Sequence, residues 1–309
     1  MVEQKNLRDK YGPWALVIGA STGLGASWAR ECAKRGMNVA ICARRLNKLQ
    51  EVSSELRENY SVETLEFVVD IAAPDAADTI RQAVSALDIG MVIYNAAVER
   101  AAPFIKMREE YHLQQIAGNA VTPMRICYHF CREMARKHRG CILLLSSMSA
   151  SAGTSNHSTY SACKSFMMQL GETLWYEMGK YGVDVSGVMV GSVVTPEFIR
   201  IQTEQGTNMT AGQAYDLSDI IGDLQVDPAC MSAQPHLCDE VASYVMDHVG
   251  EGPRLYTHPE DQLANEAYGR MDRRDGTLLL SRVTDKFFSA GHSEDLTEDA
   301  EEFIEIRKM

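Results

Sequence analysis

The sequence has no long apolar run. No stretch approaches the roughly 20 consecutive apolar residues that a membrane-spanning helix needs. The opening segment MVEQKNLRDK carries charges and lacks the apolar core of a signal peptide. We therefore expect a cytoplasmic protein that does not insert into a membrane.

Cysteine pairs at metal-ligand spacing are also missing, and basic residues are fewer than acidic ones, 30 against 42. None of the eight cysteines forms a CxxC pair, so we expect reduced thiols and no metal site. The net charge of −12 disfavours nucleic acids and anionic membranes as partners. Part of this charge lies in a C-terminal tail, which we expect to be solvated and which contains Glu294, Asp295, Glu298, Asp299, Glu301, Glu302 and Glu305.

What the chain does contain is an alternation of short β-branched runs and longer amphipathic stretches. Parallel strands need crossover helices, and right-handed crossovers place those helices on both faces of the sheet. The pattern predicts an α/β fold of the doubly wound Rossmann type, with a parallel sheet of seven strands in one domain. The expected strands are residues 14–19, 38–43, 64–70, 89–95, 141–147, 183–190 and 254–257.

A glycine-rich turn, GASTGLG, follows the first expected strand and opens a helical stretch. Gly19, Gly23 and Gly25 allow a sharp turn and a close approach of the backbone to a pyrophosphate. The phosphate would then lie on the free N–H groups of the helix N-terminus. We interpret this turn as a dinucleotide site, with an ordinary strand-to-helix turn as the alternative.

The end of the second strand indicates which dinucleotide binds. An NAD site usually has a carboxylate there, but this strand ends in ICARR, with Ala43 followed by Arg44 and Arg45. Two guanidinium groups, helped by the Ser21 hydroxyl, suit the 2′-phosphate of NADP(H). We expect Asp70 to contact the adenine amino group or to cap the next turn instead.

Two Tyr-x-x-x-Lys pairs compete for the catalytic role, YSACK at 160–164 and YEMGK at 176–180. Ser147 lies thirteen residues before Tyr160, at the end of the fifth strand, where ligands bind in open α/β sheets. Tyr176 would lie more than four helical turns further from that edge. We therefore assign the chemistry to Tyr160 and Lys164.

Together these motifs resemble the short-chain dehydrogenase/reductase family, over roughly residues 11–257. The matching elements are GASTGLG, Asp70, YNAA at 94–97, Asn119, Ser147, YSACK and VGSVVTP at 190–196. The sequence departs from the family pattern at Ile18, Tyr94, Ala97 and Val190, which puts the shape of the cofactor site in question rather than the acid/base residues.

The resemblance implies roles for individual residues. Tyr160 acts as the acid/base, Lys164 favours its phenolate form and holds the cofactor ribose, and Ser147 orients the substrate oxygen. Asn119 holds a water between Lys164 and solvent, and Thr195 binds the nicotinamide carboxamide. The full set of cofactor-binding residues expected from the motifs and the resemblance is Gly19, Ser21, Gly23, Leu24, Gly25, Arg44, Arg45, Asp70, Ile71, Asn95, Tyr160, Lys164, Val193 and Thr195.

The substrate is less constrained. The opening NLRDKYGPWALVIGASTGLG, the ARR after the second strand and the SSM at the serine resemble bacterial 7β-type hydroxysteroid dehydrogenases. A segment of weak periodicity at about 196–235 is apolar enough to cover a bulky alcohol or ketone, such as a bile acid, although its acidic residues disfavour an anionic group nearby. The alternatives are a 3-oxoacyl thioester reductase and a non-catalytic NADPH-binding sensor.

The chain continues past the last expected strand as an extension, residues 258–309. Its stretch TLLLSRVTDKFFSAG predicts a helix with an apolar stripe, and such a stripe must be buried, either in its own subunit or against another. Because the family resemblance implies dimers and tetramers, we predict a homodimer or homotetramer with residues 258–291 at or near the interface. The acidic residues after Ser293 are expected to stay loose.

Overall fold

The computed structural model describes residues 6–196, 198–200, 211–212, 218–231, 234–288 and 296–297. Its centre is a seven-stranded sheet in the order β3-β2-β1-β4-β5-β6-β9, with every neighbouring pair parallel. The strands are β1 (Trp14–Ile18), β2 (Asn38–Ala43), β3 (Thr64–Val68), β4 (Ile89–Tyr94), β5 (Gly140–Leu145), β6 (Val183–Met189) and β9 (Arg254–Tyr256). The predicted doubly wound sheet is confirmed.

Two hydrophobic cores cover the two faces of the sheet. In β1, Ala15 and Val17 enter one core and Leu16 and Ile18 the other, because successive side chains of a strand point to opposite faces. The first core is closed by α2 (Gly23–Lys34), α3 (Leu46–Tyr60) and α10 (Cys238–Asp247). The second is closed by α4 (Ala76–Ala83), α6 (Thr122–Lys137) and α7 (Ser158–Gly179).

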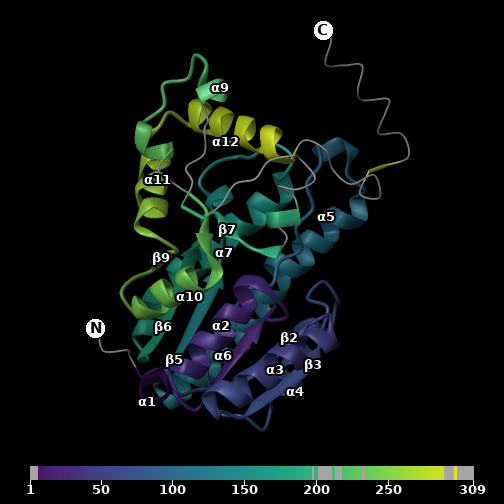
Figure 1. Cartoon of the computed structure of the whole chain (residues 1–309), viewed down its shortest axis with the longest axis vertical. Coiled ribbons are helices and arrows are strands. Elements are labelled where there is room, and N and C mark those ends of the chain that lie inside the picture. Colours follow the sequence, from purple (N-terminus) through teal and green to yellow (C-terminus); the bar gives the residue numbers. More distant parts are fainter. Residues whose placement is uncertain are drawn as a thin grey trace.

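Shorter elements lie at the ends of this frame (Figure 1). Strands β7 and β8 pair in parallel outside the main sheet. The remaining elements are α1 (Leu7–Tyr11), η1 (Phe104–Lys106), α5 (Glu109–Ile116), the π-helical turn η2 (Ala117–Val121), η3 (Met148–Ala150), β7 (Val193–Val194), α9 (Ser218–Ile221), η4 (Pro228–Met231), β8 (His236–Leu237), α11 (Pro259–Arg270) and α12 (Arg273–Phe288).

The segment at 196–235 and the C-terminal extension pack against each other, although the sequence predicts them as a lid and an extension that are separate. Leu224 and Cys230 of that segment share a hydrophobic cluster with Tyr268, Leu279 and Leu280. The guanidinium of Arg282 donates to the carbonyls of Ile220 and Ile221 at 2.9 and 2.8 Å. Helices α9, α11 and α12 therefore form one unit at the end of the molecule opposite α1 (Figure 1).

This packing bears on the predicted stripe of the extension. Leu279 and Leu280 are buried within their own chain, which is the simpler of the two burial sites that the sequence allows. Val283 is half-buried, and the side chains of Phe287 and Phe288 lie outside the described residues. For the two leucines, burial needs no neighbouring subunit.

The two described residues of the tail, Leu296 and Thr297, contact the rest of the chain. Leu296 forms an antiparallel bridge with Met107, and the Thr297 amide donates to the Lys106 carbonyl at 2.8 Å. The acidic residues that we predict to be loose lie outside the described residues. At Leu296 and Thr297, however, the tail is held, because the backbone after η1 offers a free edge for pairing.

Among the described helices, none is both long and apolar enough to cross a bilayer.

Candidate active site

The glycine turn lies between β1 and α2 and brings the backbone into contacts that leave no room for side chains. A Cβ on Gly25 would lie 1.9 Å from the Gly19 carbonyl oxygen, and one on Gly19 would lie 2.7 Å from the Ala96 backbone. Gly19 and Gly23 also have φ of 91° and 57°, in the region that disfavours other residues. The turn ends at the N-terminus of α2, the arrangement that holds a pyrophosphate. Ser21 and Leu24 lie within it.

The predicted cations stand beside this turn. Arg45 donates to the hydroxyls of Ser21 and Thr22, at 3.0 Å each, so its guanidinium reaches from the end of β2 to the turn. Arg44 is exposed next to it, and Ala43 occupies the position of the usual carboxylate. The residues present therefore suit a phosphate better than a ribose hydroxyl at this position.

Asp70, Ile71 and Asn95 complete the described surroundings of the cofactor site. Asp70 accepts a hydrogen bond from the Ala72 amide at 3.0 Å, so it caps its own turn, as the alternative interpretation predicts. Ile71 is buried and carries the carbonyl that accepts from Thr122. The side-chain amide of Asn95 donates to the Gly19 carbonyl at 3.0 Å and thereby holds the glycine turn against the end of β4.

The loop after β6 crosses in front of the same turn. A Cβ on Gly23 would lie 3.6 Å from the Thr195 Cβ, which places Thr195 directly against the glycine turn. The Thr195 hydroxyl accepts from the Phe198 amide at 3.0 Å, and Val193 pairs with His236 across the β7–β8 pair. Thr195 therefore lies against the glycine turn, and the cofactor contacts of Val193 and Thr195 stay a prediction.

Ser147 and Tyr160 meet at the carboxyl edge of the sheet. Ser147 follows β5 and Tyr160 lies in the first turn of α7, so both residues lie at this edge. Burial and then the charge of Glu99 raise the pKa of Tyr160 well above its ordinary value, while the Ser147 hydrogen bond lowers it. The protonated phenol is therefore the stable form in this structure.

Lys164 lies one turn further along α7 and is buried, with 3 % of its surface exposed. Its ammonium donates to the Leu145 carbonyl at 2.7 Å and lies 5.4 Å from the centre of the Tyr160 ring. Burial lowers the pKa of Lys164 to about 8, against the opposing charge of Glu99. Burial raises the pKa of Tyr160 in this structure, and the effect of Lys164 on the phenolate stays a prediction.

Asn119 sits in the π-helical turn η2. Its side chain accepts from the Val98 amide at 2.9 Å and donates to the Val98 carbonyl at 2.8 Å, so both ends of the amide are used to hold the loop after β4. Tyr94, where the family has Asn, donates its hydroxyl to the Gly118 carbonyl at 2.6 Å. The departure at Tyr94 thus anchors the turn that carries Asn119, and π turns of this kind are frequent at functional sites.

The second pair, Tyr176 and Lys180, lies far along α7 from this edge. Tyr176 is 65 % exposed, and the Lys180 ammonium lies over its ring at 4.4 Å. In the part of the chain that the structure describes, neither Tyr176 nor Lys180 has a neighbour that corresponds to Ser147 or Asn119. The structure keeps these two residues apart from the residues around Tyr160.

Two residues that the sequence does not single out lie at the same centre. His157 is 4 % exposed, its ring centroid is 5.6 Å from that of Tyr160, and its Nε2 lies 3.4 Å from the Glu99 carboxylate. The Glu99 side chain is 46 % exposed. Desolvation of its carboxylate by the surrounding chain opposes ionisation, but His157 and the charge of Lys164 hold the pKa of Glu99 below the ordinary value. Only the spacing of His157, three residues before Tyr160, could have signalled this contact.

This fold and this site define a dinucleotide-dependent oxidoreductase of the short-chain type. The family model for short chain dehydrogenases matches residues 13–206, more than half of the chain, and the protein belongs to that family.

Several characterised relatives are similar to this chain. A 7β-hydroxysteroid dehydrogenase of Collinsella aerofaciens is 34 % identical over 194 residues, covering 63 % of this chain and 74 % of the relative. A very-long-chain 3-oxoacyl-CoA reductase of Bos taurus is 32 % identical over 194 residues, covering 60 % of each. A solved structure from work on 7β-hydroxysteroid dehydrogenase stereoselectivity has a TM-score of 0.77 at 25 % identity and covers 89 % of this chain and 99 % of its own.

We predict that Tyr160→Phe lowers turnover by at least ~10²-fold, the ordinary effect of losing a general acid, while cofactor binding is retained. Tyr176→Phe is the matched control, because it removes a hydroxyl from the same helix outside the site. Steady-state kinetics and a cofactor titration measure both effects. Equal losses in the two variants would show that the chemical centre is wrongly placed.

We predict that Glu99→Gln moves the pH optimum of alcohol oxidation to lower pH. Oxidation needs the Tyr160 phenolate; the Glu99 charge raises the pKa of Tyr160 and also raises that of Lys164, so removing it lowers both. Glu110→Gln, on the exposed surface of α5, is the control and should leave the profile in place. A pH–rate profile of Glu99→Gln that is unmoved, or moved upward, would contradict this role.

Proposed function

We propose that this protein is an NADP(H)-dependent oxidoreductase that interconverts a secondary alcohol and a ketone on a bulky apolar substrate of the hydroxysteroid or bile-acid class. The observation that carries the proposal is that Ser147, Tyr160 and the buried Lys164 lie together at the sheet edge that also carries the glycine turn. A non-catalytic NADPH sensor would have no use for this set of acid/base groups.

The reaction follows from what each side chain can do. When bound, NADP(H) supplies or accepts the hydride. Ser147 orients the substrate oxygen by a hydrogen bond, and Tyr160, protonated in this structure, donates a proton to a ketone oxygen or accepts one from an alcohol after deprotonation. Lys164 holds the cofactor ribose and stabilises the phenolate, and Asn119 fixes the turn beside them.

The preference for NADP(H) rests on Arg45 and Arg44. Arg45 already reaches the hydroxyls of Ser21 and Thr22, so a 2′-phosphate at the glycine turn would meet two guanidinium groups and no carboxylate at position 43. A phosphate carries about two negative charges and gains most from such charge-assisted hydrogen bonds.

A bulky apolar substrate is supported by exposed apolar side chains in η1, which is linked to the start of α7. Phe104 and Ile105 are 59 and 57 % exposed in η1. His112 links η1 to the start of α7, because its ring contacts the Phe104 carbonyl at 3.1 Å and the Thr159 hydroxyl at 2.7 Å. This link holds η1 against the first turn of α7, which also carries Tyr160. The similarity to 7β-hydroxysteroid dehydrogenases supports a steroid, with any carboxylate directed away from Glu99.

A homodimer or homotetramer remains our proposal, with residues 258–291 as one candidate interface and a second surface as another. Helix α7 contacts α5 and α6, and these helices and η2 carry several large exposed apolar side chains, which mark an interaction site where they form a patch. These are Leu113, Ile116, Val121, Met124, Tyr128, Phe166, Trp175 and Tyr176. We propose that a second copy of the chain covers this face; a monomer by light scattering would contradict it.

The substrate is tested by cofactor consumption. Purified protein and NADPH are offered oxo-steroids differing in ketone position, 3-oxoacyl thioesters and small ketones. We expect kcat/KM for at least one oxo-steroid to exceed that for the other two classes by more than tenfold. Higher kcat/KM for the thioesters would replace the steroid assignment with the 3-oxoacyl alternative, and no turnover of any class by a protein that binds NADPH would favour the sensor.

The cofactor assignment is tested by substitution. Arg45→Ala and Arg44→Ala should each weaken NADPH binding by roughly 10- to 100-fold, since a hydrogen bond to a charged group contributes about 1.5–3 kcal/mol, and should change NADH binding little. Arg132→Ala, on the surface of α6, is the control. A fluorescence titration in which both cofactors weaken equally would refute the preference for NADP(H).

A further inference from the structure

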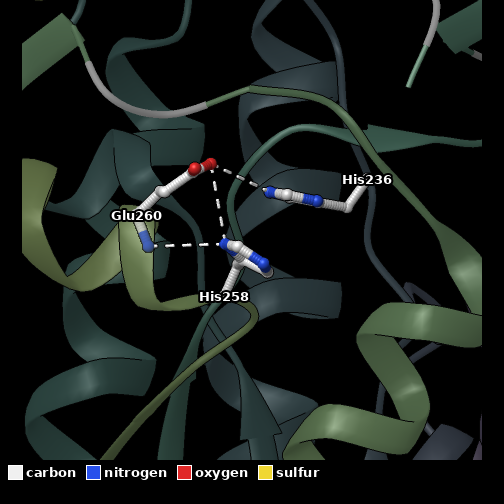
Figure 2. A group of neighbouring side chains, drawn as sticks. All are labelled: His236, His258 and Glu260. Carbon is white, nitrogen blue, oxygen red and sulfur yellow. Dashed lines mark hydrogen bonds and ion pairs between the residues drawn. The ribbon is translucent and has the colours of Figure 1, made fainter. Parts of the chain in front are cut away.

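Three side chains with metal-ligand chemistry converge outside the active site (Figure 2). His236 lies in β8, His258 is the N-cap of α11, and Glu260 is in the first turn of that helix. In the part of the chain that the structure describes, these residues form the group of His, Cys, Asp or Glu whose ligand atoms all lie within 4.8 Å of one another. The group joins the end of the lid segment to the start of the C-terminal extension.

The spacing of the ligand atoms suits a metal ion better than direct hydrogen bonds. His236 Nε2 and His258 Nδ1 lie 3.5 and 3.6 Å from the same carboxylate oxygen of Glu260. Ligands bound tetrahedrally at about 2.1 Å would be roughly 3.4 Å apart, whereas a good hydrogen bond needs about 2.7–3.2 Å. Both ring nitrogens are directed toward Glu260 (Figure 2).

One ring nitrogen of this group is buried without a hydrogen bond in the described part of the chain. The buried Nε2 of His236 has no hydrogen-bond partner among the described residues. The rings of His236 and His258 are stacked with centroids 3.9 Å apart. The unsatisfied nitrogen of His236 therefore faces the Glu260 carboxylate, 3.5 Å away.

The carboxylate is itself held in place. The side-chain amide of Gln234 donates to the Glu260 oxygen at 2.5 Å. Hydrogen bonds of this kind orient metal-binding carboxylates and contribute to affinity. His258 Nδ1 accepts a long hydrogen bond of 3.5 Å from the Glu260 amide, which a metal bond can replace.

We propose that His236, His258 and Glu260 form a binding site for a divalent transition-metal ion of the zinc type, separate from the centre around Tyr160. Two imidazoles and one carboxylate favour Zn²⁺, Co²⁺ or Ni²⁺ over Mg²⁺ and Ca²⁺, and they leave a fourth position for water. Because the His236 amide donates to the Ser192 carbonyl at 3.0 Å, the ion would fasten α11 to the β7–β8 pair beside Thr195. The proposal does not depend on the substrate or on the choice of cofactor.

The test uses the full-length chain without an affinity tag, stripped of metal with a chelator. Zn²⁺ is titrated in competition with a chromophoric chelator, and Co²⁺ is titrated while its visible absorption is recorded. We expect one ion per chain, a Co²⁺ spectrum of nitrogen and oxygen ligands without a thiolate band, and a melting temperature that rises with Zn²⁺ concentration.

Substitutions identify the ligands. His236→Gln, His258→Asn and Glu260→Gln should each weaken Zn²⁺ binding at least about tenfold and abolish the rise in melting temperature. Asn at position 258 keeps an N-cap, so a loss there is not simply a loss of the helix start. His138→Asn is the control, since His138 is exposed and its left-handed backbone tolerates Asn.

Retained NADPH binding in each variant shows that the chain is folded. Zn²⁺ affinity equal in the wild type and all three variants, or ring NMR signals of His236 and His258 that Zn²⁺ leaves unmoved, would overturn the site. A response to pH alone, with no bound metal at millimolar Zn²⁺, would overturn it as well and would leave the cluster as a shared-proton contact.

Discussion

The parallel direction of the strands is the constraint from which the site follows. Because neighbouring strands in the sheet all run the same way, their carboxyl ends meet at one edge, and the loops after β1, β4, β5 and β6 converge there. Residues as distant in sequence as Gly19, Asn95 and Ser147 are thereby brought to one region. An antiparallel connection at any of these points would have sent one of them to the opposite edge.

Lys164 makes this arrangement rigid at its most demanding point. The ammonium donates to the Leu145 carbonyl, and the Ser146 hydroxyl donates to the Lys164 carbonyl, both at 2.7 Å, so α7 and the end of β5 are tied in both directions. A buried cation costs free energy unless it is paired or hydrogen-bonded. The lowered pKa of Lys164 reflects that cost, and it places the titration of this group where a bound cofactor and Glu99 can shift it.

Much of this could be predicted from the sequence, because local patterns determine it. The seven strands follow from β-branched runs, and the glycine turn, Ser147, Tyr160 and Lys164 follow from motifs whose positions fit that sheet. Glu99 and His157 could not be predicted, since their contact depends on how the loop after β4 folds over the start of α7. For the same reason, the sequence predicts the lid and the extension as separate segments. Leu224 and Leu279 share a hydrophobic cluster but lie far apart in the sequence, and no local pattern of apolar residues connects them.

The family comparison leaves the C-terminal part of the chain uncovered. The matched residues end at 206, before α9, η4, α11 and α12, yet the last two helices and the end of the lid share one hydrophobic cluster. The lid and the extension are therefore stabilised through the same side chains. A metal ion bound by His236, His258 and Glu260 would hold the other end of this unit, next to Thr195. The position of the lid would then depend on contacts at both ends of α11.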